Sequence, residues 1–245
     1  FWNGDLGDLT KSKWTWEHCL TAARLAAELN SINIEDVASE PWLCRTMLAG
    51  WIEFRDDYFV PVAPAVVACA KSQPDTAAAY EVWGPYLDKH QLLADIVAGA
   101  RLTFVHGDYN LNNLVPTADP DQPIIALDWQ LAGVSGIGVD LASILNTSKE
   151  LGVAEVTQER FEELCAEYVS HFNQINPDHP VELNEVRLVV AAMGYSILNT
   201  VGFFFVRPSI DVAVDEHSEG VRNLVQQYST GPVMTYARVL AELGV

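Results

Sequence analysis

Three residues, Asp108, Asn113 and Asp128, place side-chain oxygen atoms within one short stretch of the sequence. Asp108 comes two residues after His106, and four residues separate it from Asn113. A carboxylate beside a hydroxyl group can orient that hydroxyl and accept its proton. A second carboxylate and an amide oxygen are hard ligands of the kind that Mg²⁺ takes. The residue types therefore predict a general base, Asp108, next to a magnesium site formed by Asn113 and Asp128.

The order His-x-Asp-x4-Asn, followed by a further Asp, matches the catalytic loop of enzymes that transfer phosphoryl groups. Such enzymes act mainly by positioning the reactants, while metal ions bridge the phosphates of ATP and neutralise their charge. His-Gly-Asp alone is common in turns, so the prediction depends on Asn113 and Asp128 following in this order. Gly107 is expected to let the backbone turn sharply or approach a neighbouring segment closely.

Two short apolar runs are predicted to position these residues. Residues 102–105 are rich in β-forming side chains and end at His106, whereas residues 124–127 end at Asp128. Short apolar runs of this kind, bounded by polar residues, are typical of strands. We therefore expect each strand to deliver one carboxylate into the loop that follows it.

Residues 102–146 resemble the aminoglycoside phosphotransferase and choline kinase-like group of small-molecule kinases, which are related to protein kinases. The matching segments are His106–Tyr109, Asn113, Asp128–Gln130 and Gly138–Ala142. The resemblance implies that Asp108 is the catalytic base, and that Asn113 and Asp128 bind the metal and the nucleotide. It implies ATP and Mg²⁺ as cofactors. It also implies that Asp140 is a buried carboxylate holding the catalytic loop through His106 or nearby backbone amides; the alternative is that Asp140 caps the helix beginning there.

Outside this stretch the sequence is predicted to be mainly helical, so the expected fold class is α+β with a small β element. Thr15 is a candidate N-cap for the first helix, Pro41 is expected to open the second, and Gly84-Pro85 is a candidate kink in the fourth. Helical patterns mark residues 15–29, 41–55, 64–71, 74–97, 139–150, 157–174, 182–206, 211–229 and 231–243.

The features of a kinase N-terminal lobe are missing from this sequence. That lobe is an antiparallel sheet with a phosphate-covering loop and a lysine that pairs with the ATP phosphates. Gly4–Gly7 is not such a loop, and no lysine lies in an alternating, strand-like run. We therefore interpret residues 1–13 as a hinge-like entry segment and residues 14–245 as the helical C-terminal lobe, with its catalytic core at 102–146. The N-terminal lobe is expected to be supplied in cis or in trans.

The charge balance limits the class of partner. The chain has 33 acidic residues against 14 basic ones, a net charge of −19. This disfavours nucleic acid and anionic membrane surfaces, and would suit a cationic substrate, although solubility alone also explains it. Residues 188–206 carry no charge, but Gly194, Ser196 and Asn199 interrupt the apolar run, which favours a buried core helix over a membrane span. Together with the absence of a signal-peptide pattern, this predicts a cytoplasmic location.

The cysteines and two acidic, aromatic clusters carry weaker signals. No Cys-x-x-Cys pair occurs, so we expect free, buried thiols in a reducing compartment rather than a zinc or redox site. Residues 51–59 and 211–219 combine carboxylates with aromatic rings or a histidine, and are candidates for an acceptor site. The first cluster also has the spacing of an ordinary core stripe. The four cysteines are Cys19, Cys44, Cys69 and Cys165.

Two classes of function remain. The first is an ATP- and magnesium-dependent kinase acting on a hydroxyl of a small molecule: an aminoglycoside, another hydroxylated natural product, a sugar or an amino alcohol. The second is a non-catalytic kinase-like module that binds a ligand or partner and lacks the nucleotide-binding lobe. The presence of Asp108, Asn113 and Asp128 favours the first class, because a binding module has no chemical need for all three.

Overall fold

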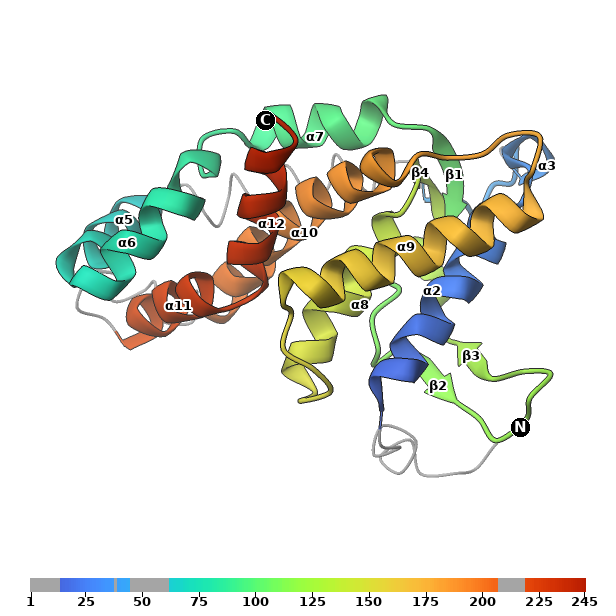
Figure 1. Ribbon diagram of the computed structural model, residues 1–245, viewed down its shortest axis with the longest axis horizontal. Helices are drawn as coiled ribbons and strands as arrows, with labels where there is room; N and C mark the ends of the chain where they lie inside the picture. Colours follow the sequence, from blue (N-terminus) through green and yellow to red (C-terminus); the bar gives the residue numbers. More distant parts are fainter. Residues whose placement is uncertain (1–13, 38, 45–61, 207–218) are drawn as a thin grey trace. The chain divides into compact units, whose positions relative to one another are not determined.

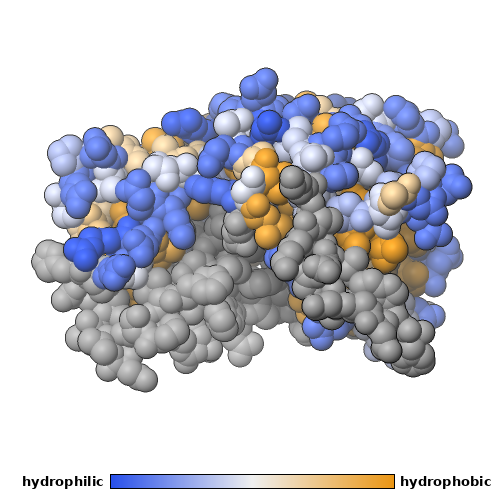
Figure 2. Space-filling view, turned by 90° about the horizontal axis from the view of Figure 1, so that it is seen from below, coloured by the Kyte–Doolittle hydropathy of each residue, from blue (hydrophilic) through white to orange (hydrophobic). Residues whose placement is uncertain are grey.

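The computed structural model describes residues 14–37, 39–44, 62–206 and 219–245 (Figure 1). This part of the chain is mainly helical and contains two small antiparallel sheets, as expected for the α+β class. It divides into two compact units: the first contains the described residues up to 44 together with 101–187, and the second contains residues 62–100 together with the described residues from 188 onward. Hydrophilic residues predominate on the described surface in Figure 2, with small hydrophobic patches between them.

Two packed helices form the main support of the first unit. α2 (Trp16–Asn30) begins at the predicted N-cap Thr15, whose hydroxyl accepts from the His18 backbone while the His18 side chain accepts from Thr15 N–H. Its buried face is rich in alanine, which lets a second helix approach closely. That helix is α9 (Gln158–Ile175), which contributes larger buried side chains. The unit also contains α3 (Ile34–Val37), α8 (Val139–Glu150) and the first residues of α10 (Leu183–Val206).

Four short strands of the first unit surround the predicted site. β1 (Leu102–Val105) pairs with β4 (Gly133–Gly136), and β2 (Leu114–Pro116) pairs with β3 (Ile124–Ala126), both antiparallel. The predicted strands at 102–105 and 124–127 are thus confirmed, the second one residue shorter. β2 and β4 were not predicted, because one has three residues and the other is bounded by glycines.

The chain after α3 runs beside β4. Cys44 N–H donates to the carbonyl oxygen of Ala132 at 2.8 Å, and Cys44 forms a parallel bridge with Gly133. A side chain at Gly133 would collide with the Cys44 carbonyl group, so this close approach requires glycine. The prediction that Pro41 opens a helix is therefore wrong for residues 41–44, which form a turn leading into this bridge. The rest of that predicted helix lies outside the described residues.

The second unit is helical where the structure describes it. Its centre contains the fully buried rings of Trp83, Tyr195 and Tyr236, with the Tyr195 hydroxyl donating to the Trp83 carbonyl oxygen at 2.6 Å. The predicted helix 74–97 is broken at Gly84 by a short 3-10 turn rather than kinked. The elements are α5 (Ala63–Ser72), α6 (Pro74–Trp83), η1 (Gly84–Tyr86), α7 (His90–Gly99), the later part of α10, α11 (Glu219–Thr230) and α12 (Pro232–Glu242).

Several further predictions have a clear outcome. All four cysteines are free; three are buried, whereas Cys44 is half-buried and lies outside any helix. No helix among the described residues has the length and apolar content that a membrane span requires. The hinge-like segment 1–13, the acceptor cluster 51–59 and nearly all of the cluster 211–219 lie outside the described residues.

Candidate active site

The loop of residues 106–113 begins where β1 leaves the sheet. Val105 and His106 are buried, and the next residue, Gly107, has a φ of 81°. This left-handed conformation costs glycine little and most other residues more, so Gly107 provides the sharp turn expected of it. The turn carries Asp108 out of the core to a half-buried position.

His106 ties the start of this loop to the end of β3. Its Nε2 lies 2.9 Å from the carbonyl oxygen of Leu127, and its Nδ1 lies 3.3 Å from the Asp108 backbone nitrogen. A carbonyl can only accept and a backbone N–H can only donate, so both contacts fit the neutral ring with its proton on Nε2. The ring also packs against Trp129, with centroids 4.5 Å apart. His106 is thus placed to support the loop and not to contact a ligand.

Two asparagine amides hold the carboxylate of Asp108. Asn110 Nδ2 donates to its Oδ1 at 2.7 Å, and Asn113 Nδ2 donates to its Oδ2 at 2.8 Å. The same Asn113 nitrogen donates to the Asp108 carbonyl oxygen at 3.0 Å. With its nitrogen turned toward Asp108, the Asn113 Oδ1 accepts no hydrogen bond from the part of the chain that the structure describes. An amide oxygen is a hard ligand of the kind that a cation takes.

Asp128 is brought to the same loop by the residue before it. Leu127 N–H donates to the Asn113 carbonyl oxygen at 2.8 Å, while the Leu127 carbonyl accepts from His106. Asp128 is exposed, and its carboxylate accepts a 3.3 Å hydrogen bond from Gln130. Its φ of 57° makes it the only non-glycine residue with positive φ among the described residues. Such a conformation costs on the order of 1–3 kcal/mol and is most often found at functional sites.

Asp140 lies beneath the loop and is 1% exposed. Its Oδ2 accepts from His106 N–H and its Oδ1 from Gly107 N–H, both at 3.0 Å. The N-cap of α8 is Gly138, and no side chain caps that helix end. Asp140 therefore bonds the backbone of the loop instead of capping α8. Burial raises the pKa of Asp140, and the two backbone hydrogen bonds act in the opposite direction.

Other contacts that anchor the loop were not predicted. The Tyr109 hydroxyl donates to the Ala22 carbonyl oxygen of α2 at 3.3 Å, and Leu111 N–H donates to Thr147 Oγ1 of α8 at 3.0 Å. Asn110 could have been noticed, since Asn in a turn often bonds the backbone two residues on, as it does here with Asn112 N–H at 2.9 Å.

The available oxygens fit a divalent metal bound together with a nucleotide. Among the described residues, no three His, Cys, Asp or Glu side chains are grouped closely enough to hold a metal ion alone. Mg²⁺ in kinases does not need such a cage, because it takes one or two protein oxygens and completes its shell with phosphates and water. Asn113 Oδ1 and the exposed carboxylate of Asp128 can supply those protein oxygens. Asp108, whose carboxylate accepts from the Asn113 amide, is the group able to accept a proton.

Comparison with known proteins finds solved structures of similar fold. Among solved structures, the chain is similar to an ethanolamine kinase from Plasmodium vivax, with a TM-score of 0.50 and 12% sequence identity. The similarity covers 97% of this chain and 65% of that kinase, so the chain spans slightly less than two thirds of its length. At this identity the likeness shows the fold alone. A comparison with curated protein sequences gave no match.

The family is shown by the sequence itself. The model of the ecdysteroid kinase-like family matches residues 38–177, which is more than half of the chain and includes the loop, Asp128 and Asp140. The resemblance to small-molecule kinases drawn from residues 102–146 is thereby confirmed. The chain belongs to the ecdysteroid kinase-like family, within the small-molecule kinases that share the protein-kinase-like fold.

Proposed function

We propose that this chain is the catalytic, helical lobe of a kinase that transfers the γ-phosphoryl group of ATP to a hydroxyl group of a small molecule. The observation that supports this most strongly is that hydrogen bonds link the residues of the site to one another. Asn113 bonds Asp108 through its side chain and Leu127 through its backbone, which places Asp128 at the same loop. A base and two hard oxygen ligands are thus held by one short network.

Each residue of the site has a distinct role in this proposal. Asp108 accepts the proton of the acceptor hydroxyl as the hydroxyl oxygen bonds to phosphorus and the bond to the ADP oxygen breaks. Asn113 and Asp128 would hold Mg²⁺, which would supply positive charge to neutralise the phosphates. Asn110 keeps Asp108 oriented, and Asp140 fixes the backbone from which Asp108 projects.

We propose further that an N-terminal lobe, in cis or in trans, supplies the remaining phosphate contacts. The three described lysines are engaged elsewhere: Lys71 lies over the Tyr80 ring, Lys89 over the Tyr86 ring, and Lys149 near Glu155. The similarity to only 65% of the ethanolamine kinase chain is consistent with a further lobe.

The acceptor class follows from charge and from the names of the relatives. The net charge of −19 favours a cationic acceptor, which suits an amino alcohol such as ethanolamine. The family name points instead to a polyhydroxylated steroid, an ecdysteroid. Aminoglycosides, other hydroxylated natural products and sugars complete the set worth testing. Use of ATP would place the reaction in the cytoplasm.

The test measures ADP release from Mg-ATP with ethanolamine, an ecdysteroid and an aminoglycoside as acceptors. It compares the 245-residue chain alone with the same chain joined to or mixed with an N-terminal kinase lobe. We expect the isolated chain to unfold cooperatively yet to show no transfer above background, because the proposed lobe would supply the remaining phosphate contacts. Addition of the lobe should produce transfer to at least one acceptor.

Two results would contradict this proposal. Phosphorylation of a small molecule by the isolated chain would show that other residues of the chain hold the phosphates. A thermal shift with an acceptor, without ADP release even when the lobe is present, would favour a non-catalytic binding module.

A further inference from the structure

Asn30 connects three elements beneath the site, although no motif or spacing in the sequence distinguishes it. It is the last residue of α2 and is 3% exposed. Its Nδ2 donates to the Phe104 carbonyl oxygen of β1 at 2.8 Å. Its Oδ1 accepts from the Tyr168 hydroxyl of α9 at 2.6 Å and, at a longer 3.5 Å, from Gly138 N–H at the start of α8. Every polar atom of this buried amide therefore has a partner.

Two of these partners lead directly to the site. Phe104 lies two residues before His106, and Gly138 lies two residues before Asp140. One segment runs from Phe104 to His106 and the other from Gly138 to Asp140. These two segments meet where Asp140 accepts from His106 N–H and Gly107 N–H. One amide thus sets the spacing between the strand that leads into the Asp108 loop and the helix start that carries Asp140.

Tyr168 fixes the orientation of that amide. Its ring is fully buried, and burial, with a further contribution from the nearby Asp140 charge, raises the pKa of Tyr168 well above its ordinary value. The hydroxyl therefore remains a donor at any working pH. Because it can donate to Asn30 Oδ1 and not to Nδ2, it keeps Nδ2 directed at the Phe104 carbonyl.

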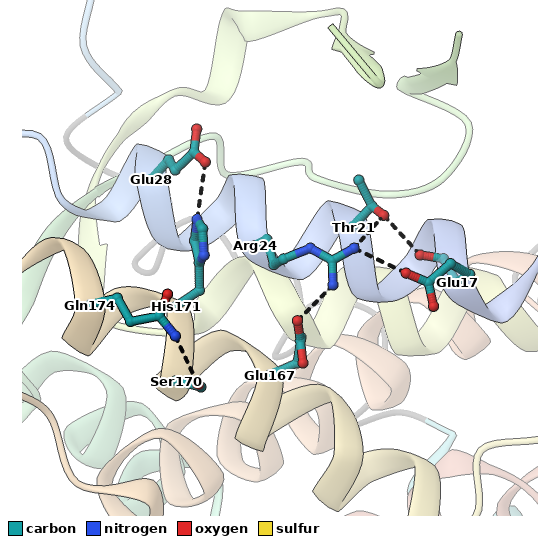
Figure 3. A network of polar contacts seen from close by, with 8 residues as sticks. All are labelled: Glu17, Thr21, Arg24, Glu28, Glu167, Ser170, His171 and Gln174. Carbon is teal, nitrogen blue, oxygen red and sulfur yellow. Dashed lines mark hydrogen bonds and ion pairs between the residues drawn. The ribbon is translucent and has the colours of Figure 1, made fainter. Parts of the chain in front are cut away.

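The outer face of the same helix pair is also bridged (Figure 3). Arg24 of α2 lies 2.6 Å from Glu167, the residue before Tyr168, and His171 of α9 lies 3.0 Å from Glu28. These contacts are partly exposed to solvent, where ion pairs contribute little. The buried contact between Asn30 and Tyr168 is thus the polar contact between α2 and α9 whose loss matters most.

We propose that Asn30 and Tyr168 are positioning residues for the 106–113 loop. Through their hydrogen bonds, the packing of α9 against α2 determines the position of the backbone that orients Asp108. Without them, the Phe104 carbonyl and Gly138 N–H lose their shared partner, and the contact of Asp140 with the loop loosens. This proposal rests on the proposed function only in that the loop is taken to be catalytic.

The test uses the isotope-labelled chain with Tyr168→Phe, which removes one hydroxyl, and Asn30→Ala. Amide hydrogen exchange is measured at His106 and Gly107 and compared with exchange along α9. The matched control is Tyr195→Phe, which removes a hydroxyl that is equally buried and also donates to a carbonyl at 2.6 Å, in the second unit. We expect Tyr168→Phe to accelerate exchange at His106 and Gly107 at least about tenfold, and Asn30→Ala to accelerate it more.

A second readout separates positioning from general stability. When the N-terminal lobe is present, Tyr168→Phe should lower kcat while leaving the KM for Mg-ATP unchanged, and the His106 ring nitrogen shifts should move. Tyr195→Phe should change none of these. If Asn30→Ala does not fold, Tyr168→Phe decides the outcome alone.

The proposal is overturned if Tyr168→Phe accelerates exchange at His106 and Gly107 no more than along α9, or no more than Tyr195→Phe does. Accelerated exchange in a protein that transfers phosphate to no acceptor even when the N-terminal lobe is present would support the coupling and contradict the proposed function instead. The two failures are therefore distinguishable.

Discussion

Asp140 and Asp128 are both carboxylates of the candidate site, yet the chain holds them in opposite ways. Asp140 is 1% exposed, and each of its oxygens accepts a backbone N–H. Asp128 is exposed, sits on a left-handed backbone and accepts one 3.3 Å hydrogen bond from a neighbouring side chain. The oxygens of Asp140 are fully used by the fold, whereas those of Asp128 remain available to a ligand.

The same contrast extends to two groups of residues. The buried support consists of Asn30, Asp140 and Tyr168, whose polar atoms are paired within the protein. The polar edge consists of Asp108, Asn113 and Asp128, which keep oxygens that a metal or a hydroxyl group can use. A site of this kind needs both groups, because catalysis by positioning requires that the residues contacting the ligand are held rigidly by residues beneath them.

The largest expected effect is a loss of turnover, caused by a substitution of Asp108 in the polar edge. Asp108→Asn keeps the shape of the side chain but removes its ability to accept a proton. We expect turnover in the presence of the N-terminal lobe to fall by roughly 10²–10⁴-fold, the usual weight of general acid–base catalysis. Asp121→Asn, in the exposed loop between β2 and β3, is the control. Turnover of the Asp108 variant within about threefold of the parent would remove the residue from this role.

The next effect concerns stability and should be confined to the buried support. Asp140→Ala leaves the N–H groups of His106 and Gly107 buried without a partner. We expect the free energy of unfolding to fall by about 1–3 kcal/mol for each unpaired group, measured by urea denaturation. A loss no larger than the roughly 0.5 kcal/mol typical of surface substitutions would show that Asp140 does not support the loop.

Asp128→Gly should do the reverse of Asp140→Ala: it should leave stability intact and abolish ligand binding. Glycine adopts the φ of 57° without strain, so we expect the free energy of unfolding to stay constant or rise by up to about 1 kcal/mol. Binding of Mg-ATP in the presence of the lobe should nevertheless be lost, because the carboxylate is gone. Calorimetry measures the affinity, with Asp121→Gly as the control. Equal affinity in the Asp128 variant and the parent would exclude Asp128 from the metal site.

The smallest effect compares the reaction rates of two thiols of the first unit, Cys19 in α2 and Cys44 beside β4. Burial raises the pKa of Cys19 to about 12, whereas Cys44 is half-buried beside β4. At about pH 8, below the ordinary thiol pKa of about 8.5, we expect iodoacetamide to modify Cys44 and to spare Cys19 until the chain unfolds. Mass spectrometry of the peptides gives both rates. Equal rates would show that α2 is not packed as the structure has it.

The raised pKa of Cys19 also determines how its contribution to folding stability changes with pH. The folded state keeps the Cys19 proton up to about pH 12, while the unfolded chain releases it near about pH 8.5. The unfolded state therefore binds fewer protons in that window, and the contribution of Cys19 to stability is lost progressively as pH rises above about 8.5.

The parts of the fold that could be predicted are those determined by neighbours in sequence. The Thr15 cap, the strand before His106 and the spacing of Asp108 and Asn113 are local patterns. The role of Asp140 remained open between two alternatives, because its partner His106 is 34 residues away. Asn30 gave no signal at all, since its partners Phe104 and Tyr168 lie 74 and 138 residues away.

The wrong prediction at Pro41 has a similar cause. Proline favours the first turn of a helix, but residues 41–44 turn toward the sheet because Cys44 bonds Ala132 of a distant segment. Local propensity is a weak guide where a long-range backbone contact competes with it. The same reason explains why β4 was missed, since its pairing with β1 cannot be read from its own residues.

A titration of the isotope-labelled chain with Mn²⁺ and ATP tests most directly whether the polar edge is a metal–nucleotide site. Bound Mn²⁺ broadens the NMR signals of the nuclei closest to it, even when binding is weak. We expect the side-chain amide of Asn113 and the backbone amide of Asp128 to broaden first, and this selectivity to disappear in Asp128→Gly. Broadening at Asp121 and other exposed acidic residues, with Asn113 unaffected, would contradict the assignment of the site.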